Sequence, residues 1–405
     1  MSQGVYRVKQ EAFQRKCPNC GASLVYDPNN AKLYCAHCKS YVDFDKSKDV
    51  REREFNELIN MEKWDETAVR YYRCENCGAS TVLPRTTLAT KCPYCGSPVV
   101  VDEEQTGLVR PDTIVPFEIS EQQAEEHLSA WAKKKLFAPR DFRKGHKNLS
   151  IKGVYTPAWT FDLNTVTYYK GRLGKHRTRT VRRNGKTYTE TYTEWFYVDD
   201  MLDSSFDDIY VSGNKHISVK DFNNLGLTNH SKYAVYTDEY LAGYMADNYT
   251  VPPEDAYQIA RKKADSAIYS DIMARHNADV DGGLQIDTHV VSRSFKYVML
   301  PVYVVSCKYR KKNYNQFVAG VYSGNSASKV KVSGKAPVSV WKVLVTVLVC
   351  LGILAGIIAA VILTSGEWSF DFGDFEDFGL KLINNRLASG ELLSHPISQA
   401  SRTYV

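Results

Sequence analysis

Eight cysteines in the first hundred residues have the spacing of metal ligands. They form four Cys-x-x-Cys pairs, and in each half of the region 14 residues separate two pairs. Two such pairs can present four thiolates tetrahedrally to one zinc ion, and a glycine directly after a pair permits the tight turn. The sequence therefore predicts two zinc ribbons and two zinc ions, with Cys17, Cys20, Cys35 and Cys38 in the first site and Cys74, Cys77, Cys92 and Cys95 in the second.

Other chemistry for these cysteines fits the pattern less well. Disulfides need an oxidising compartment, which the topology expected for this chain denies them. A thioredoxin-type redox pair usually occurs once per domain, whereas these pairs recur regularly. An iron–sulfur cluster stays open as an alternative to zinc. Since sulfur fills all four positions of each site, we expect a structural metal, and we interpret His37, inside one pair, as a bystander.

The composition is that of a globular protein with two or three domains. The 405 residues include 52 basic and 46 acidic ones, for a net charge of +6, and the mean hydropathy is −0.37. A hydrophobic share of 43% excludes a wholly disordered chain, and the low hydropathy excludes a polytopic membrane protein. The small net charge does not by itself indicate nucleic-acid binding.

One segment near the other end is predicted to cross a membrane. Val343–Leu363 has no charge in 21 residues, and at about 1.5 Å per residue it spans roughly the 30 Å of a bilayer core. Lysines precede this segment and acidic residues follow it, so we expect a single-pass protein of the cell membrane with its N-terminus in the cytoplasm. The first residues lack an apolar core of signal-peptide length, so no cleaved signal is expected.

The flanks of this helix complete the expected membrane region. Residues 324–342 are predicted to be a basic juxtamembrane linker, and residues 364–405 an acidic, aromatic tail outside the cell. Gly352 and Gly356 form a small-xxx-small pair, which makes a homodimer through the helix an open possibility.

The middle of the chain, residues 111–323, is predicted to be a mixed α+β domain rich in antiparallel strands. Ser120 and Gln123 resemble a capping box that opens one helix, and Pro253 opens a second helix with an apolar face. Three β-rich stretches are expected at 154–170, 187–198 and 296–322, with a two-residue hairpin turn at Asn184-Gly185. The mixed charges of residues 46–70, between the ribbons, predict a spacer helix.

The basic surplus is concentrated around that hairpin turn. Eight basic residues fall within 17 positions that contain no acid. They are candidates for binding phosphate groups, either of anionic lipid or of nucleic acid, and a solvated hairpin is the plain alternative. The residues are Lys170, Arg172, Lys175, Arg177, Arg179, Arg182, Arg183 and Lys186.

No motif of a known catalytic site occurs. The chain lacks a phosphate-binding Gly-x-x-x-x-Gly-Lys-Ser/Thr loop, a dinucleotide-binding Gly-x-Gly-x-x-Gly, a His-Glu-x-x-His and a Gly-x-Ser-x-Gly. The two remaining cysteines, Cys307 and Cys350, are interpreted as packing residues. We therefore expect no enzymatic activity, and no catalytic residue is assigned.

Several motifs together resemble a bacterial family of TFIIB-type zinc-ribbon membrane proteins, across about residues 15–325. They are Cys17-Pro-Asn-Cys20-Gly, Tyr72-Arg-Cys74-Glu-Asn-Cys77-Gly-Ala, Cys92-Pro-Tyr-Cys95-Gly-Ser, Ile114-Val-Pro-Phe117, Gly153-Val-Tyr-Thr-Pro157-Ala-Trp159-Thr-Phe-Asp162, Tyr240-Leu-Ala-Gly243 and Leu300-Pro301-Val-Tyr303. Members are labelled as primosomal-helicase-like or phage-replication proteins, although this chain has no helicase motor motif. Some are associated with phage-shock-protein A homologues, and the resemblance implies a scaffold in the envelope-stress response.

The sequence thus predicts an α+β chain in seven parts. We expect a membrane-anchored scaffold that recruits protein partners, among them a protein like phage-shock protein A, and that contacts membrane lipid. The alternative is a membrane-tethered nucleic-acid-binding protein, and a hydrolase or redox enzyme ranks third. The parts are a first ribbon (1–45), the spacer helix (46–70), a second ribbon (71–110), the central domain (111–323), the linker (324–342), the transmembrane helix (343–363) and the tail (364–405).

Overall fold

A computed structural model describes most of the chain from residue 15 to residue 365. The gaps in this range are residue 48 and residues 62–68, 85–88, 101–108, 145–150, 228–232, 310–311 and 324–328. Residue contacts divide the chain into two compact units, Met1–Val338 and Ser339–Val405. The predicted tail lies outside the described residues.

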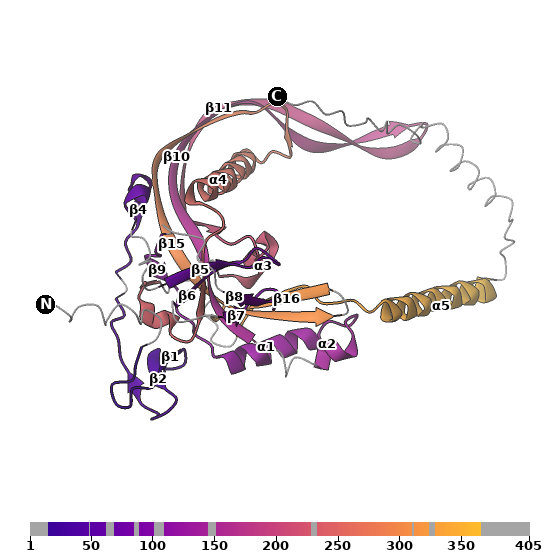
Figure 1. Cartoon of the computed structure of the whole chain (residues 1–405). Coiled ribbons are helices and arrows are strands. Elements are labelled where there is room, and N and C mark those ends of the chain that lie inside the picture. Colours follow the sequence, from indigo (N-terminus) through magenta and orange to yellow (C-terminus); the bar gives the residue numbers. More distant parts are fainter. Residues whose placement is uncertain are drawn as a thin grey trace, which may run out of the picture. The chain divides into compact units, whose positions relative to one another are not determined.

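The first unit is built around three long antiparallel strands. β10 (Ile151–Arg183) pairs with β11 (Lys186–Ser212) on one side and with β15 (Gln285–Tyr309) on the other. The three strands curve together, and helix α4 (Pro253–Arg275) lies against their concave face (Figure 1). The turn between β10 and β11 is Asn184-Gly185, with φ angles of 49° and 74°, as the type I′ geometry predicts.

Short strands extend this frame into a twelve-stranded, mostly antiparallel sheet. β16 (Lys312–Ala319) pairs with the end of β15, and β13 (Met245–Asp247) runs parallel to β10. The other short members are β4 (Arg53–Glu54), β5 (Val69–Arg73), β6 (Ser80–Pro84), β9 (Thr113–Ile114), β12 (Ala234–Val235), β14 (Val280–Asp281) and β17 (Val332–Gly334). The fold is therefore α+β, as predicted.

The predicted helices of the central domain are confirmed. α1 (Glu121–Lys133) begins with a capping box, in which Ser120 accepts from the Gln123 amide and the Gln123 side chain accepts from the Ser120 amide. α4 buries its predicted apolar face against the sheet. Shorter helices are α2 (Arg140–Lys144), α3 (Val219–Leu225) and the 3₁₀ helices η2 (Phe55–Asn60) and η4 (Asp238–Leu241).

The segment between the ribbons differs from the predicted spacer helix. In its described part it forms β4, which pairs with β15, and then the short 3₁₀ helix η2. Phe55 packs against the rings of Tyr257 and Phe295, and Arg53 makes a two-pronged ion pair with Asp112. These long-range contacts hold the segment on the central domain, and a free α-helix would not make them.

The predicted juxtamembrane linker also contributes to the sheet. β17 pairs with β16, because Val330 and Val332 alternate with lysines and pack against the core. The first unit therefore continues past residue 323, and only the end of the predicted linker lies beyond it.

The second unit contains one described helix, α5 (Val340–Ser365). It covers the predicted span Val343–Leu363. Its residues Val340–Val361 are long and apolar enough to cross a membrane, and none of them is buried within the protein. Because only a lipid-facing or partner-facing helix is apolar on every side, this finding supports a membrane anchor.

Candidate metal centres

Each of the four cysteine pairs closes a tight turn of the same geometry. In every turn the amide that follows the second cysteine donates to the carbonyl of the first cysteine, at 2.6 to 2.9 Å. The residue at this position has a positive φ, from 62° to 74°. It is Gly21, Gly78 and Gly96 in three turns and Lys39 in the fourth, so the expected glycine is replaced once.

The turns bring each set of four sulfurs together. All four Sγ atoms lie within 4.8 Å of one another in both sets. The closest pairs are Cys17–Cys38 at 3.5 Å and Cys20–Cys35, Cys74–Cys95 and Cys77–Cys92 at 3.6 Å. A zinc ion with bonds of about 2.3 Å to four tetrahedral sulfurs places those sulfurs about 3.8 Å apart. Both predicted sets therefore have the size of a zinc site, and sulfur fills all four positions.

The thiols of each set lie close enough to alter one another's protonation. A hydrogen bond with Ser40 lowers the pKa of Cys17 to about 6. In the second set, the contact with Cys77 lowers the pKa of Cys92 to about 5 and raises that of Cys77. A thiolate is the form that binds a metal, and the contact that favours the thiolate of Cys92 disfavours that of its neighbour Cys77.

The first ribbon is a small sheet of its own. Its strands β1 (Leu24–Asp27), β2 (Lys32–Cys35) and β3 (Tyr41–Val42) pair only with one another. It contacts the central domain through Tyr26, whose amide donates to the Ala242 carbonyl at 2.9 Å and whose ring packs edge-on against Tyr240. The first ribbon therefore packs against the central domain as a separate small sheet.

The second ribbon is part of the large sheet. Its strands β5 (Val69–Arg73) and β6 (Ser80–Pro84) form a hairpin, and β6 pairs with β13, which in turn pairs with β10. The other two strands, β7 (Ala89–Lys91) and β8 (Pro98–Val100), form a separate pair. Backbone hydrogen bonds therefore connect the second metal site to the longest strand of the protein.

A buried polar cluster fixes the second ribbon further. Tyr94, between the ligands Cys92 and Cys95, is 2% exposed and donates to Asp247. Asn214 donates to the same carboxylate at 2.7 Å, and Thr81 donates at 3.2 Å. Burial raises the pKa of Asp247 to about 7. The cluster joins three segments that are distant in sequence.

Seven of the eight basic residues lie along β10, and Lys186 begins β11 after the turn. Arg177 pairs with Glu194 at 2.8 Å, Arg179 pairs with Glu190 at 2.9 Å, and the guanidinium of Arg172 lies over the Trp195 ring. Both glutamates belong to β11, so they lie outside the 17-residue segment that contains no acid. Within the described part of the chain, no acidic side chain lies within 4 Å of Lys170, Lys175, Arg182, Arg183 or Lys186.

Besides the two cysteine sets, three aspartates lie close enough together to bind a metal, but a lysine ammonium is already paired with them. The carboxylates of Asp162, Asp207 and Asp208 lie within 4.8 Å of one another. The Lys296 ammonium, only 5% exposed, lies 2.8 Å from Asp208 and 3.9 Å from Asp162. Burial raises the pKa of Asp162 to about 6. We interpret this group as an internal ion-pair cluster where β11 bulges and the hairpin leaves the core.

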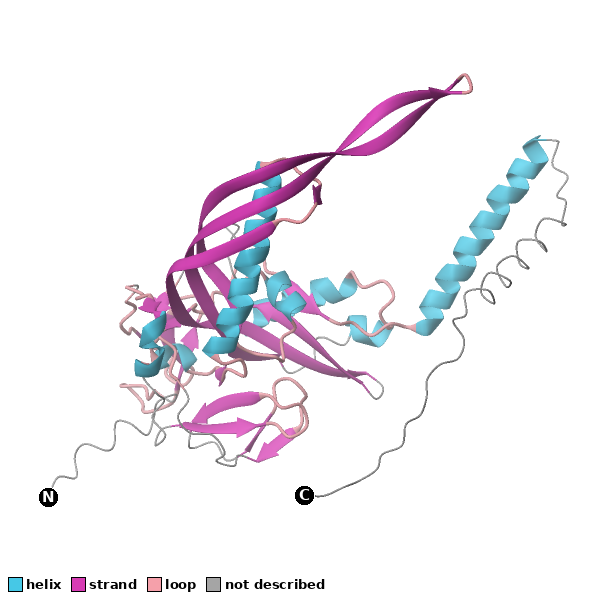
Figure 2. Cartoon of the chain, turned by 90° about the horizontal axis from the view of Figure 1, so that it is seen from above, coloured by secondary structure: helices cyan, strands magenta, loops and turns pink. Residues whose placement is uncertain are grey.

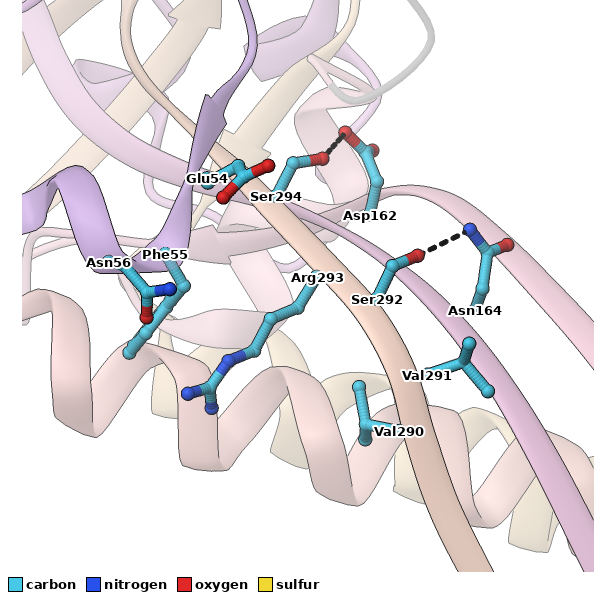
Figure 3. Close-up of a pocket in the computed structure, with 10 residues that line it drawn as sticks. All are labelled: Glu54, Phe55, Asn56, Asp162, Asn164, Val290, Val291, Ser292, Arg293 and Ser294. Atoms are coloured by element: carbon cyan, nitrogen blue, oxygen red, sulfur yellow. Dashed lines mark hydrogen bonds between the residues drawn. The ribbon is translucent and has the colours of Figure 1, made fainter.

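Next to this cluster is an open hollow of about 590 Å³ (Figure 3). Asp162 accepts from Ser294, and Asn164 donates to Ser292, along its wall. The guanidinium of Arg293 lies over the Phe55 ring, 4.3 Å from its centre. The ten lining residues include no histidine and no cysteine.

Comparison with known proteins identifies one similar protein without a known function. The chain is 29% identical over 330 residues to "Uncharacterized protein YdjG" of Bacillus subtilis (strain 168), which covers 81% of this chain and 91% of that protein. The aligned length includes most of the first unit. No protein-family model matches the chain, and no solved structure matches it.

Sequence reasoning found the eight ligands and missed the two buried polar clusters. Tyr94 and Asp247 are 153 residues apart, and Lys296 and Glu52 are 244 apart. No local pattern marks such pairs. A signal did exist in Asp162 and Lys296, which are charged residues inside stretches that were otherwise read as buried strands. Cys307 is buried, as expected.

Proposed function

We propose that this protein is a non-enzymatic scaffold, anchored in the membrane, whose zinc ribbons are structural and whose first unit recruits protein partners at the cytoplasmic face. The observation that carries the proposal is the closed geometry of both sulfur sets. A zinc ion with four sulfur ligands has no position for water or substrate. The apolar helix that follows the first unit supplies the anchor.

The partner to test first is a phage-shock-protein A-like protein, which the family resemblance suggests. The full chain is reconstituted into phosphatidylcholine vesicles, and the purified partner is mixed with them and floated on a density gradient. Neutral lipid keeps the partner from binding the bilayer through charge alone. The partner should float with the loaded vesicles at high salt and remain at the bottom with empty ones.

The matched control for this experiment keeps the anchor and removes one metal site. The variant Cys74→Ser/Cys77→Ser should insert equally well and capture less partner. Capture of DNA or RNA that is lost at high salt, with no partner in the floated fraction, would instead support the nucleic-acid alternative.

The expected topology has its own test. A reporter that is active only in the cytoplasm, fused after Val405, should be silent if the C-terminus lies outside. The same reporter fused before Met1 should be active. Activity at the C-terminus would contradict the proposed orientation.

We also propose that the hairpin tip contacts anionic lipid through Lys175, Arg183 and Lys186. These residues alternate along the same side of the hairpin, and each is free of an acidic partner within the described residues. In nanodiscs that contain phosphatidylglycerol, hydrogen exchange at residues 175–194 should be slower than in phosphatidylcholine. Reversal of the three charges should abolish the difference, while Lys220→Glu/Lys262→Glu, elsewhere on the surface, should not.

A further inference from the structure

The hairpin of β10 and β11 projects beyond the sheet as a two-stranded arm (Figure 2). Pairing of β10 with β15 ends at Lys170, and pairing with β14 ends at Gly174, whereas β10 and β11 continue to Arg183 and Lys186. Among the described strands, none therefore pairs with residues 175–194 besides β10 and β11 themselves. An isolated two-stranded hairpin is at best marginally stable in water, so an arm of this length gains from a surface that covers it.

The two faces of the arm have different chemistry. On the hairpin, side chains of even-numbered β10 residues share a face with odd-numbered β11 residues. Nearer the core this is the outer face, because the alternate residues, such as Tyr169 and Leu173, are buried against α4. Four large side chains are exposed on it: Tyr168 at 54%, Trp195 at 43%, Tyr197 at 68% and Met201 at 44%.

Towards the tip, most side chains on the outer face are threonines. They are Thr178, Thr180, Thr187, Thr189, Thr191 and Thr193; Thr178 faces Thr191 and Thr180 faces Thr189, whereas Thr187 faces Arg182 and Thr193 faces His176. The band of large side chains is thus on the half nearer the core, and the small β-branched side chains are on the half nearer the tip. Large and small surfaces of this kind can interdigitate when one half lies on the other.

This face also carries charges: Lys170, Arg172, Asp199 and Asp203 on the half nearer the core, and Arg182 on the half nearer the tip. Arg182 stands eight residues beyond Gly174, and Asp203 is opposite Val166, eight residues before Gly174. Both side chains are exposed, and no ion pair is found for either among the described residues. Gly174 faces Trp195 in the hairpin. If a two-fold axis passes near this pair, the position of Arg182 along one arm coincides with the position of Asp203 along the other arm. Arg182 of one copy then meets Asp203 of the other, twice in each dimer.

We propose that the outer faces of two arms pack together, with a second copy of this chain as the occupant and a two-fold axis near Trp195. The indole of Trp195 already lies against Gly174 and Gly282, where a side chain would collide with it. The guanidinium of Arg172 lies over part of the same ring, and the exposed part of Trp195, 43%, would meet the same residue of the second copy. Tyr168 and Met201 would lie on Thr180 and Thr189 of the partner, and the two twisted ribbons would coil around each other.

Two other arrangements fit the arm less well. The free edge of β11 carries seven acidic residues and one lysine, so direct pairing of two such edges would place like charges together. An anionic membrane is only weakly favoured by the outer face, because Asp199 and Asp203 offset two of its three basic residues, Lys170, Arg172 and Arg182. The side of the arm with Lys175 and Arg183 stays free for lipid in the dimer.

A charge exchange tests this contact in the full chain in detergent. All variants carry Gly352→Leu/Gly356→Leu, which prevents close pairing of α5 helices, and mass is measured by analytical ultracentrifugation. The parent should be a dimer. Arg182→Asp and Asp203→Arg should each weaken the dimer at least tenfold. A mixture of the two variants should dimerise again, because both contacts are then between opposite charges.

The mixture also shows that both variants are folded, since misfolded chains would not recover on mixing. Arg183→Asp, one residue away on the other face, should leave the dimer unchanged. A monomeric parent would overturn the proposal, as would a dimer that resists both single changes. A monomer that binds phosphatidylglycerol vesicles and shifts its Trp195 fluorescence would overturn it in favour of a lipid-binding face.

Discussion

The two ribbons have the same ligand spacing and the same turns, yet they meet the rest of the protein differently. The first ribbon contacts the central domain around Tyr26, through ring packing and a backbone hydrogen bond to Ala242, and its described strands pair with none of that domain's strands. The second is joined to it by strand pairing through β6 and β13, and by the buried hydrogen bonds of Tyr94. A metal site that is part of a sheet stabilises that sheet, whereas a docked site stabilises only itself.

Removal of one ligand from each site should give the largest difference. Zinc binding to such sites is worth roughly 10–16 kcal/mol, about as much as the stability of a whole domain. Cys74→Ser should therefore reduce hydrogen-exchange protection of β6, β13 and β10, and Cys35→Ser should reduce it in β1–β3 alone. The measurement is exchange on the full chain by mass spectrometry.

Each of these variants should retain one zinc ion. Metal analysis of the unmodified chain should find two ions, and iron with a visible absorption band would contradict the zinc assignment. Equal loss of protection in both variants would mean that the ribbons are integrated to the same extent.

The next largest effect is expected when the ring of Tyr26, which packs the first ribbon against the central domain, is removed. Tyr26 is 3% exposed and packs against Tyr240 with ring centres 5.4 Å apart. Tyr26→Ala should cost about 3 kcal/mol of docking free energy and expose residues 43–50 to protease while zinc remains bound. Tyr34→Ala, in the same small sheet but partly exposed, is the control and should resist cleavage. Loss of zinc from Tyr26→Ala would show that the first site depends on docking.

A smaller effect is expected when the second ribbon loses one buried hydroxyl. Tyr94→Phe leaves Asp247 with two donors and should lower the free energy of unfolding by about 1–3 kcal/mol, measured by urea titration. Tyr41→Phe removes a hydroxyl that donates to Asp27 at an exposed position of the first ribbon. It should change stability by less than about 0.5 kcal/mol. Similar losses in both variants would contradict the importance of the buried cluster.

The smallest effect concerns the one turn without glycine. Lys39 has a φ of 62°, which costs a residue with a side chain about 1 kcal/mol. Lys39→Gly should stabilise the first ribbon by up to that amount and slow the loss of zinc to a chelator. Gly96→Ala is the converse, because nothing lies within 4 Å of an added Cβ there and only the backbone conformation is strained. Faster zinc loss from Lys39→Gly would mean that the contact of Lys39 with Tyr34 outweighs the strain.

Local patterns were sufficient wherever the structure depends on neighbours in sequence. The four cysteine pairs, the capping box at Ser120, the hairpin turn at Asn184-Gly185 and the apolar helix each follow from residues a few positions apart. Their energies come from turn geometry, capping or uniform hydrophobicity, all of which can be read along the chain. The proposed function uses two of these features, the cysteine pairs and the apolar helix.

Tertiary structure decided what the sequence left open. Segments that look like a spacer and a linker became β4 and β17, because free strand edges of the central sheet were available to pair with them. The basic run on β10 received acidic partners from β11 only when the strands came into register. Thus the sequence by itself determined the two cysteine clusters, the turns and the long apolar helix. Which ribbon is built into the sheet, and which charges stay free, depended on strand pairing between residues far apart in the chain.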